Sequence, residues 1–172
     1  MSDLFRDVAA AGDPRALTIG PWIRRAVTIV LVVVVVLALL DVFGQRPSAS
    51  VATSPRAVLR LTAPKALRGG LFFESRVEIR AVDAIDHPRL VLDPGWFEGM
   101  QFNSIEPGAV GEASRGRRVV FSYDALNAGE TMTVWLQFEV NPTTVGHQPY
   151  GIELDDAETP VARLERDLTV LP

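Results

Sequence analysis

The chain has 172 residues, no cysteine and a formal net charge of −4, so thiolate catalysis, cysteine-based metal sites and disulfides are excluded. Beyond residue 50 it carries twelve basic and seventeen acidic residues, a mildly acidic balance that argues against nucleic acid as a partner and against docking on anionic lipid. This part of the chain is long enough for one domain of about 120 residues, which must be held together by core burial alone.

Residues 1–21 are predicted to form a short cytoplasmic tail. An apolar helical face runs from Leu4 to Ala11 and ends at Gly12-Asp13-Pro14. A helix this short is marginal by itself, so it is either a frayed or interfacial helix or a docking element for a partner. Gly20-Pro21 then interrupts the chain, and Pro21 suits the first turn of a following helix.

An uncharged run from Ala26 to Leu40 dominates the sequence. With its flanks it reaches the roughly 20 residues that span a bilayer, so we predict one transmembrane helix over residues 22–44. Aromatic and basic residues at its ends would anchor it at the headgroups, and apolar residues would face the lipid. The predicted anchor residues are Trp22, Arg24, Arg25, Val33, Leu37 and Phe43.

There are three alternatives to a membrane anchor. A buried soluble helix is rarely apolar all round, and a buried strand is rarely this long. A cleaved signal peptide stays open, because the uncharged core reaches only the upper end of the usual length and Val42-Phe43-Gly44 resembles a weak cleavage site. The long region before the core and Asp41 after it argue against cleavage. Arg24 and Arg25 on one side and Asp41 on the other predict a plasma-membrane protein with a cytoplasmic N-terminus and an extracytoplasmic C-terminal domain.

Residues 45–55 are small, polar and proline-bearing, and they are predicted to be a linker. From residue 56 the hydrophobic period is two, which predicts strands. Strands recur with turn residues between them, and this predicts an antiparallel two-sheet β-sandwich over residues 56–172. The expected strands cover residues 58–61, 71–81, 89–93, 100–105, 118–123, 131–140, 149–155 and 161–171. Arg166 interrupts the apolar row of the last one, as expected at an edge or a bulge.

The stretch Val119–Val140 (VVFSYDALNAGETMTVWLQFEV) resembles the bacterial conserved-repeat domains of the DUF11 and CARDB type. Leu126, Ala128, Gly129, Glu130, Thr131 and Thr133 stand where those domains have Leu-x-x-Gly-Glu/Asp and an alternating Thr/Val strand. The segment Leu92–Met100 resembles their proline-glycine segment, so the resemblance covers about residues 56–140. It implies a mainly β chain with an immunoglobulin-like β-sandwich on an exported protein and a non-enzymatic role. Those modules often occur in tandem, whereas this chain has one copy behind one helix.

Motifs for catalysis or metal binding are missing from the sequence. There is no G-x-S-x-G, no G-x-G-x-x-G and no P-loop, and His87 and His147 lie in separate turns. Asp155-Asp156-x-Glu158 is the best calcium candidate, with a charged hairpin tip as the alternative. The basic cluster Arg115, Arg117 and Arg118 reads as a solvated turn. We therefore expect no catalytic residue, no cofactor and no metal.

Three large aromatic residues are the candidate interface. Trp135 falls on the polar face of the strand over residues 131–140, and Trp96 and Phe97 lie in a Pro-Gly loop. Exposed aromatic side chains often mark interfaces; the alternative is that a loop covers Trp135 or that Trp96 plugs the end of the sandwich.

Three functions follow from these features. The first is a non-enzymatic single-pass protein whose sandwich binds a membrane-protein partner, as an accessory or scaffolding subunit. The second is a surface module that stacks glycan or cell-wall polymer on Trp96, Phe97 and Trp135. The third, an enzyme, would require a polar pocket that gathers His147 with acidic residues.

Overall fold

The computed structural model describes residues 14–39 and 45–171, with the helical side chains described from residue 21 on. The chain divides into two compact units, Met1–Phe43 and Gly44–Pro172, which are described separately. The predicted tail helix before residue 12 and the predicted anchor residue Phe43 lie outside the described residues.

The first unit contains one helix, α1, over Pro14–Leu39. Its segment Pro21–Leu39 has 19 residues and a mean hydropathy of 2.4, and none of it is buried. By length and composition this segment could cross a membrane, and a signal sequence has the same properties. The expected break at Gly20-Pro21 is wrong, because α1 continues through Pro21. One proline removes one hydrogen bond of the helical ladder, which the helix-forming residues on both sides tolerate here.

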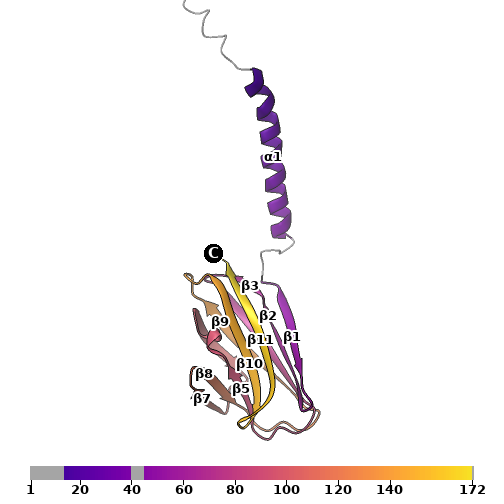
Figure 1. The fold of residues 1–172 in the computed structure, drawn as a ribbon, viewed down its shortest axis with the longest axis vertical. Coiled ribbons are helices and arrows are strands. Elements are labelled where there is room, and N and C mark those ends of the chain that lie inside the picture. The colour runs from indigo at the N-terminus through magenta and orange to yellow at the C-terminus, as the bar shows by residue number, and fades with distance from the viewer. Residues whose placement is uncertain (1–13, 40–44, 172) are drawn as a thin grey trace, which may run out of the picture. The chain divides into compact units, whose positions relative to one another are not determined.

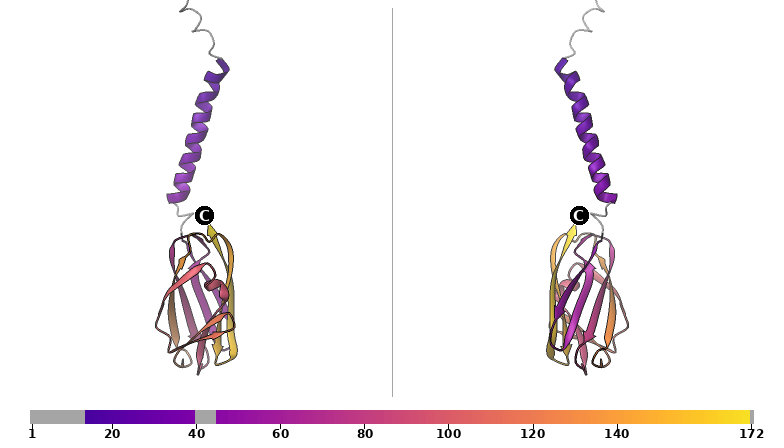
Figure 2. Two further views of the ribbon diagram at one scale, coloured as in Figure 1. Left: turned by 90° about the vertical axis from the view of Figure 1, so that its left-hand side faces the viewer. Right: turned by 90° about the vertical axis from the view of Figure 1, so that its right-hand side faces the viewer.

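The second unit is a sandwich of two sheets (Figures 1 and 2). The five-stranded sheet has the order β1-β2-β4-β9-β6, and the six-stranded sheet has the order β3-β11-β10-β5-β8-β7. The strands are β1 (Pro47–Thr53), β2 (Ala57–Pro64), β3 (Ala66–Arg68), β4 (Phe72–Ala81), β5 (Pro88–Leu92), β6 (Met100–Glu106), β7 (Gly111–Arg115), β8 (Arg118–Ser122), β9 (Thr131–Val140), β10 (Gly146–Asp156) and β11 (Thr159–Leu171). A single 3-10 turn, η1 (Pro94–Trp96), follows β5.

The predicted fold class is confirmed. All strand pairings are antiparallel except the short parallel pair of β3 with β11. All eight predicted strands are present, and β9 has the predicted bounds. Leucine, isoleucine, valine and phenylalanine side chains from the inner faces of both sheets form one core.

Two segments that were predicted to be irregular are strands. Residues 45–55 are not a linker, because Pro47–Thr53 forms edge strand β1 and pairs with β2 along its whole length. The loop before residue 117 contains edge strand β7, which pairs with β8. Both strands are polar and largely exposed, so they lack the apolar alternation that reveals a half-buried strand.

Arg166 occupies a core-facing position of β11 and is only 8% exposed. At Arg166, β11 pairs with β10 alone, because β3 joins β11 only at residues 169–171. The expectation of an edge is therefore confirmed, and no bulge occurs at this position. Its guanidinium donates to the backbone carbonyls of Ser48 at 2.8 Å, Leu61 at 3.2 Å and Ala63 at 3.0 Å, and to Ser48 Oγ at 2.6 Å. Arg166 therefore connects β11 of one sheet to β1 and β2 of the other.

Candidate functional site

The turn η1 carries Trp96 into the sandwich. Trp96 is fully buried, and its indole N–H donates to the carbonyl of Gly151 at 2.9 Å. Its ring lies 5.1 Å from that of Phe138 and 4.6 Å from that of Tyr150. Gly95 permits this approach, because a Cβ at that position would lie 1.8 Å from the carbonyl oxygen of Pro149. Of the two interpretations of Trp96, the interface is wrong and the alternative, a side chain that plugs the sandwich, is confirmed. The satisfied N–H lets the whole ring enter the core.

Phe97 is half-buried behind the same turn. Its ring packs against Phe102 at 6.3 Å and Phe138 at 6.2 Å. It therefore belongs to the margin of the core, and little of its ring remains for a ligand.

Trp135 lies on the opposite side of β9 from Phe138, because side chains three positions apart in a strand point to opposite faces. It is 36% exposed on the outer face of the five-stranded sheet. Arg76, its cross-strand neighbour on β4, holds its guanidinium carbon 5.3 Å from the ring centroid, a cation–π contact. Glu78 pairs with both Arg76 at 3.7 Å and Arg60 at 3.5 Å. Trp135 is therefore a partly exposed aromatic residue bordered by charges, and it shares no surface with Trp96.

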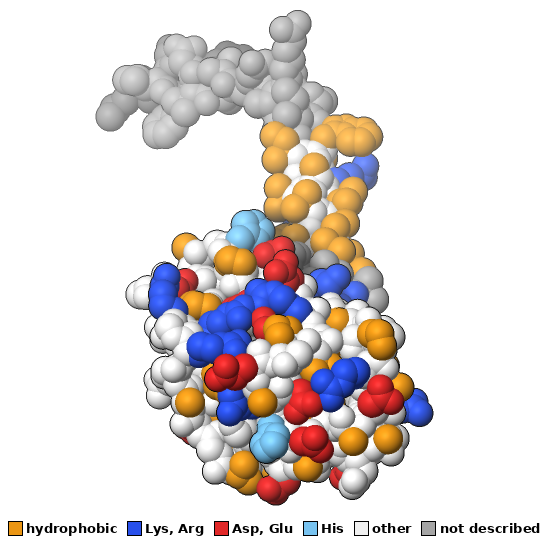
Figure 3. Space-filling model, turned by 60° about the horizontal axis from the view of Figure 1, so that its bottom comes forward, with side chains coloured by type: hydrophobic (Ala, Val, Ile, Leu, Met, Phe, Trp, Pro, Cys, Tyr) orange, Lys and Arg blue, Asp and Glu red, His pale blue; other side chains and the backbone are white. Residues whose placement is uncertain are grey.

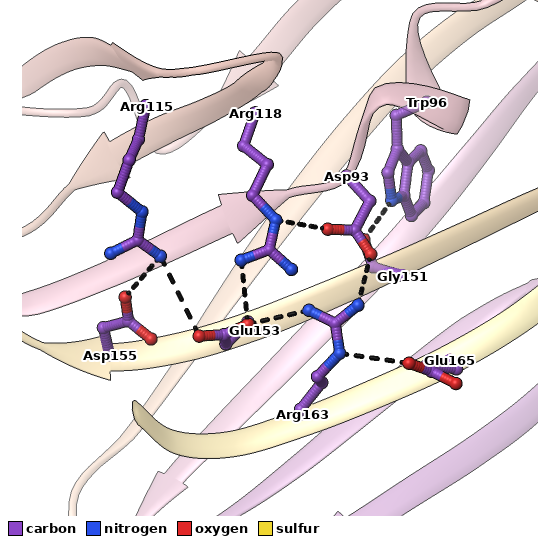
Figure 4. A network of polar contacts seen from close by, with 9 residues as sticks. All are labelled: Asp93, Trp96, Arg115, Arg118, Gly151, Glu153, Asp155, Arg163 and Glu165. Carbon is purple, nitrogen blue, oxygen red and sulfur yellow. Dashed lines mark hydrogen bonds and ion pairs between the residues drawn. The ribbon is translucent and has the colours of Figure 1, made fainter. Parts of the chain in front are cut away.

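The outer face of the six-stranded sheet carries a network of ion pairs (Figure 4). Arg118 on β8 contacts Asp93 at 2.7 Å and Glu153 at 3.1 Å. Arg163 on β11 contacts the same two carboxylates at 2.8 Å and 2.7 Å. Figure 3 shows basic and acidic side chains close together on the face of the sandwich that it views. Two arginines from different strands thus clamp two carboxylates between them.

Arg115 extends the network to Asp155, whose carboxylate it reaches at 3.0 Å. Arg117 pairs with Glu98. The expectation of a solvated turn is confirmed for Arg117, whose side chain is 79% exposed at the turn between β7 and β8. It is wrong for Arg115 and Arg118, which cover carboxylates of β10 that are almost inaccessible to solvent. The sequence shows the arginines, but their partners lie far along the chain, 35 residues away for Arg118 and Glu153.

The two β10 carboxylates are shifted in opposite directions. Burial alone would raise the pKa of Glu153, but hydrogen bonds from Arg163 and Arg118 outweigh it, and the pKa lies below its usual range. Burial raises the pKa of Asp155, and the neighbouring Glu153 carboxylate raises it further against the opposing charge of Arg115. Neither Asp155 oxygen has an aligned hydrogen-bond donor among the described residues.

A groove of about 590 Å³ lies beside this network, between η1 and strands β10 and β11. Neither histidine lines it. Of its four carboxylates, Asp93, Glu98 and Glu165 are each paired with an arginine, and Asp167 is exposed to solvent. An acid or base for catalysis needs a carboxylate poised to exchange a proton, which such pairing opposes. The network holds β8, β10, β11 and η1 together and offers no evident chemistry.

The calcium candidate is also occupied by arginines. Asp155 pairs with Arg115, and Asp156 pairs with Arg56 at 2.6 Å. Across residues 14–39 and 45–171, no three His, Asp or Glu side chains gather in a way that could hold a metal ion.

No protein-family model matches the sequence, and no curated protein matches it either. Solved structures with a similar arrangement include a non-cellulosomal cohesin from the archaeon Archaeoglobus fulgidus, with 15% identity, a TM-score of 0.42, and coverage of 73% of this chain and 92% of that one. The CARDB domain of the PF1109 protein from Pyrococcus furiosus has 13% identity, a TM-score of 0.41, and coverage of 73% and 89%. A CARDB domain is thus among the structural neighbours, as the resemblance in Val119–Val140 implied.

A third neighbour is AvmM, which catalyzes macrocyclization in alchivemycin A biosynthesis. It has 10% identity, a TM-score of 0.44, and coverage of 75% of this chain and 90% of that one. All three identities are at or below 15%, so these similarities concern the arrangement of the strands, and the function is argued from the residues themselves.

Proposed function

We propose that this chain is a single-pass membrane protein whose β-sandwich binds a protein partner, as an accessory or scaffolding subunit of a membrane complex. In this proposal α1 is the anchor, its N-terminus is cytoplasmic, and the sandwich lies outside the cytoplasm. The exposed apolar surface of Pro21–Leu39 and the basic residues Arg24 and Arg25 at its N-terminal end support the anchor and its orientation.

One observation supports the binding surface: Trp135 is on the outer face of a central strand and not at a loop tip. β9 lies between β4 and β6, so its backbone is held on both sides. The cation–π contact with Arg76 orders the indole before any partner arrives, which lowers the entropic cost of binding. A rigid, partly exposed tryptophan surrounded by paired charges has the composition of an interface centre with a polar rim.

The three aromatic side chains do not form the open surface that the glycan alternative needs. Stacking of a sugar polymer on Trp96, Phe97 and Trp135 would require the three rings on one open surface, and Trp96 is buried on the other side of β9 from Trp135. The protein-partner function is therefore the one that we propose.

The test is affinity purification of the full chain from native membranes in mild detergent. We expect one stoichiometric partner with the natural chain and its loss with Trp135→Ala, because truncating a central tryptophan costs about 2 kcal/mol of binding, or about thirtyfold in Kd. Val110→Ala is the matched control, since Val110 is 66% exposed at a different part of the surface. Recovery of no stoichiometric partner, or equal recovery with Trp135→Ala, would contradict the proposal.

A further inference from the structure

The sandwich has one end at which the chain enters it. The side chain of Gln45 donates to the carbonyl of Phe72 at 3.0 Å, so the first described residue of this unit lies beside the start of β4. The loop over residues 65–71, which includes the short strand β3, lies against the end of β9 and the turn over residues 141–145. Gly70 N–H donates to the Val140 carbonyl at 2.8 Å, and a Cβ at Gly69 would lie 2.8 Å from the Pro142 carbonyl oxygen. These two loops, with Gln45 and Phe72, are termed the entry end.

The entry end exposes three large apolar side chains. Leu71 is 40% exposed, Phe72 64% and Val145 59%. Phe72 is the first outward residue of β4, where the following outward positions are charged. Exposed aromatic and aliphatic side chains at one end of a polar domain mark a contact with a partner or a membrane.

Charge is distributed unevenly between the two ends of the sandwich. The two entry-end loops contain Lys65 and Arg68, both exposed, and no acidic residue. The loop after η1 meets the turn over residues 141–145, because the Gly99 carbonyl accepts from Asn141 N–H at 3.0 Å, and its acidic residue Glu98 is paired with Arg117. Glu139 of β9, opposite Phe72, is the acidic residue nearest this end on the five-stranded sheet. The loops at the opposite end are joined by hydrogen bonds such as Val82 N–H to the Arg56 carbonyl at 2.7 Å. They contain one basic residue, Arg56, and the acidic residues Asp83, Asp86, Asp124, Glu130, Asp156 and Glu158.

The covalent link to α1 identifies what lies nearest the entry end. Five residues, 40–44, separate Leu39 from Gln45, and a fully extended chain of that length spans at most about 22 Å. A helix that ends at the edge of the hydrocarbon therefore keeps the entry end within reach of the headgroup layer.

We infer that the entry end rests on the bilayer surface, an inference that depends on the proposed function of α1 as a membrane anchor. Leu71, Phe72 and Val145 enter the headgroup layer, and Lys65 and Arg68 lie against anionic phosphates. The acidic opposite end then points away from the negatively charged surface. The net negative charge of the domain by itself argues against docking on anionic lipid. The uneven distribution of charge outweighs it, because the end that meets the lipid carries Lys65 and Arg68. This contact orients the sheet face around Trp135 relative to the membrane.

The test uses single cysteines, since the natural chain has none. Full chains with Val145→Cys, Val110→Cys or Val33→Cys are labelled with nitrobenzoxadiazole and reconstituted into vesicles of phosphatidylcholine and phosphatidylglycerol. Lipids with a nitroxide near the headgroup report proximity by quenching. We expect quenching and a blue shift at position 145 and neither at position 110, which lies at the opposite end and is equally apolar.

The label at position 33 tests the membrane anchor separately from the bilayer contact of the entry end. Quenching at position 33 by a deep nitroxide, with position 145 as unquenched as position 110, would overturn the bilayer contact and leave the anchor intact. No quenching at position 33 would overturn the anchor and this contact with it. A label at 145 that is shielded only in native membranes would assign the entry end to a protein and also overturn the contact.

The basic residues are tested separately in the position-145 chain. With Lys65→Gln and Arg68→Gln together, we expect quenching at 145 to decrease in the anionic vesicles and to equal that seen in pure phosphatidylcholine. Unchanged quenching would overturn the electrostatic part of the contact. Equal urea midpoints for all labelled chains in detergent show that each variant folds.

Discussion

Arg166 shows how a single residue connects the two sheets. Its guanidinium is enclosed between β11 and β2 and is satisfied by three backbone carbonyls and a hydroxyl. A buried cation is costly unless it is hydrogen-bonded, and here the donors match acceptors at the edge of the opposite sheet. One of these acceptors, Ser48, belongs to the strand that follows the predicted anchor.

Replacing Arg166 by Met is expected to lower the free energy of unfolding by about 2–4 kcal/mol, because buried carbonyls lose a charged donor. Arg80→Met, at an exposed outward position of β4, is the control and is expected to change it by less than about 0.5 kcal/mol. Urea denaturation of both variants measures the difference. Equal effects would show that the Arg166 hydrogen bonds contribute little.

Asp155 leads to a prediction about pH. Its pKa is raised above the ordinary 3.8 in the folded protein, so the folded state binds the proton more tightly than the unfolded state. Its contribution to stability therefore falls as pH rises from 3.8 through the folded pKa. Asp155→Asn removes this loss, so the stability of the variant relative to the natural chain should increase as the pH rises from 3.8 through the folded pKa. Denaturation of both chains at a series of pH values measures the relative stability. A relative stability that stayed constant or decreased would contradict the raised pKa of Asp155.

The candidate site was only partly predictable from the sequence. The outward position of Trp135 follows from the strict alternation of β9, whereas the burial of Trp96 depends on the Gly151 carbonyl, 55 residues away. The ion-pair network was missed for the same reason: Asp93 and Arg163 are 70 residues apart, and only the sheet order brings them together.

At the scale of elements, η1 acts as a plug whose position depends on one glycine. Gly95→Ala would place a methyl group against the Pro149 carbonyl and force η1 and Trp96 outward, with an expected loss of about 3 kcal/mol or more. Gly108→Ala is the matched control, because a Cβ there meets nothing within 4 Å. Thermal or urea denaturation compares the two, and a fully stable Gly95→Ala chain would contradict the account of η1.

Strand β1 could not be predicted from the sequence pattern. β4 and β9 were predictable because charged and apolar residues alternate along them, but β1 consists of proline and small residues with one valine. It is a strand because the edge of β2 offers it backbone hydrogen bonds and Arg166 binds its carbonyl. Tertiary pairing, which no local pattern records, decides such a segment.

Amide hydrogen exchange on the full chain distinguishes a strand from a linker. The β1 amides that face β2 are expected to be protected to a similar degree as those of β2 itself, because they exchange only when the strand pair opens. Exchange of all amides in Pro47–Thr53 at the rate of an unstructured peptide would restore the linker interpretation.

The whole molecule combines an exposed apolar helix with a cysteine-free sandwich that carries a rigid tryptophan on one sheet. Five residues separate Leu39, the last described residue of α1, from Gln45, the first described residue of the folded unit.

The most direct test of the central claim is the sidedness of the full chain in intact cells. A cysteine replacing Val110 in the sandwich, or Ser2 in the tail, is exposed to a membrane-impermeant maleimide before and after lysis. The account predicts labelling at 110 in intact cells, labelling at position 2 only after lysis, and a membrane-bound chain that retains its first residues. Labelling at 110 only after lysis, or a mature N-terminus beyond Gly44, would contradict it.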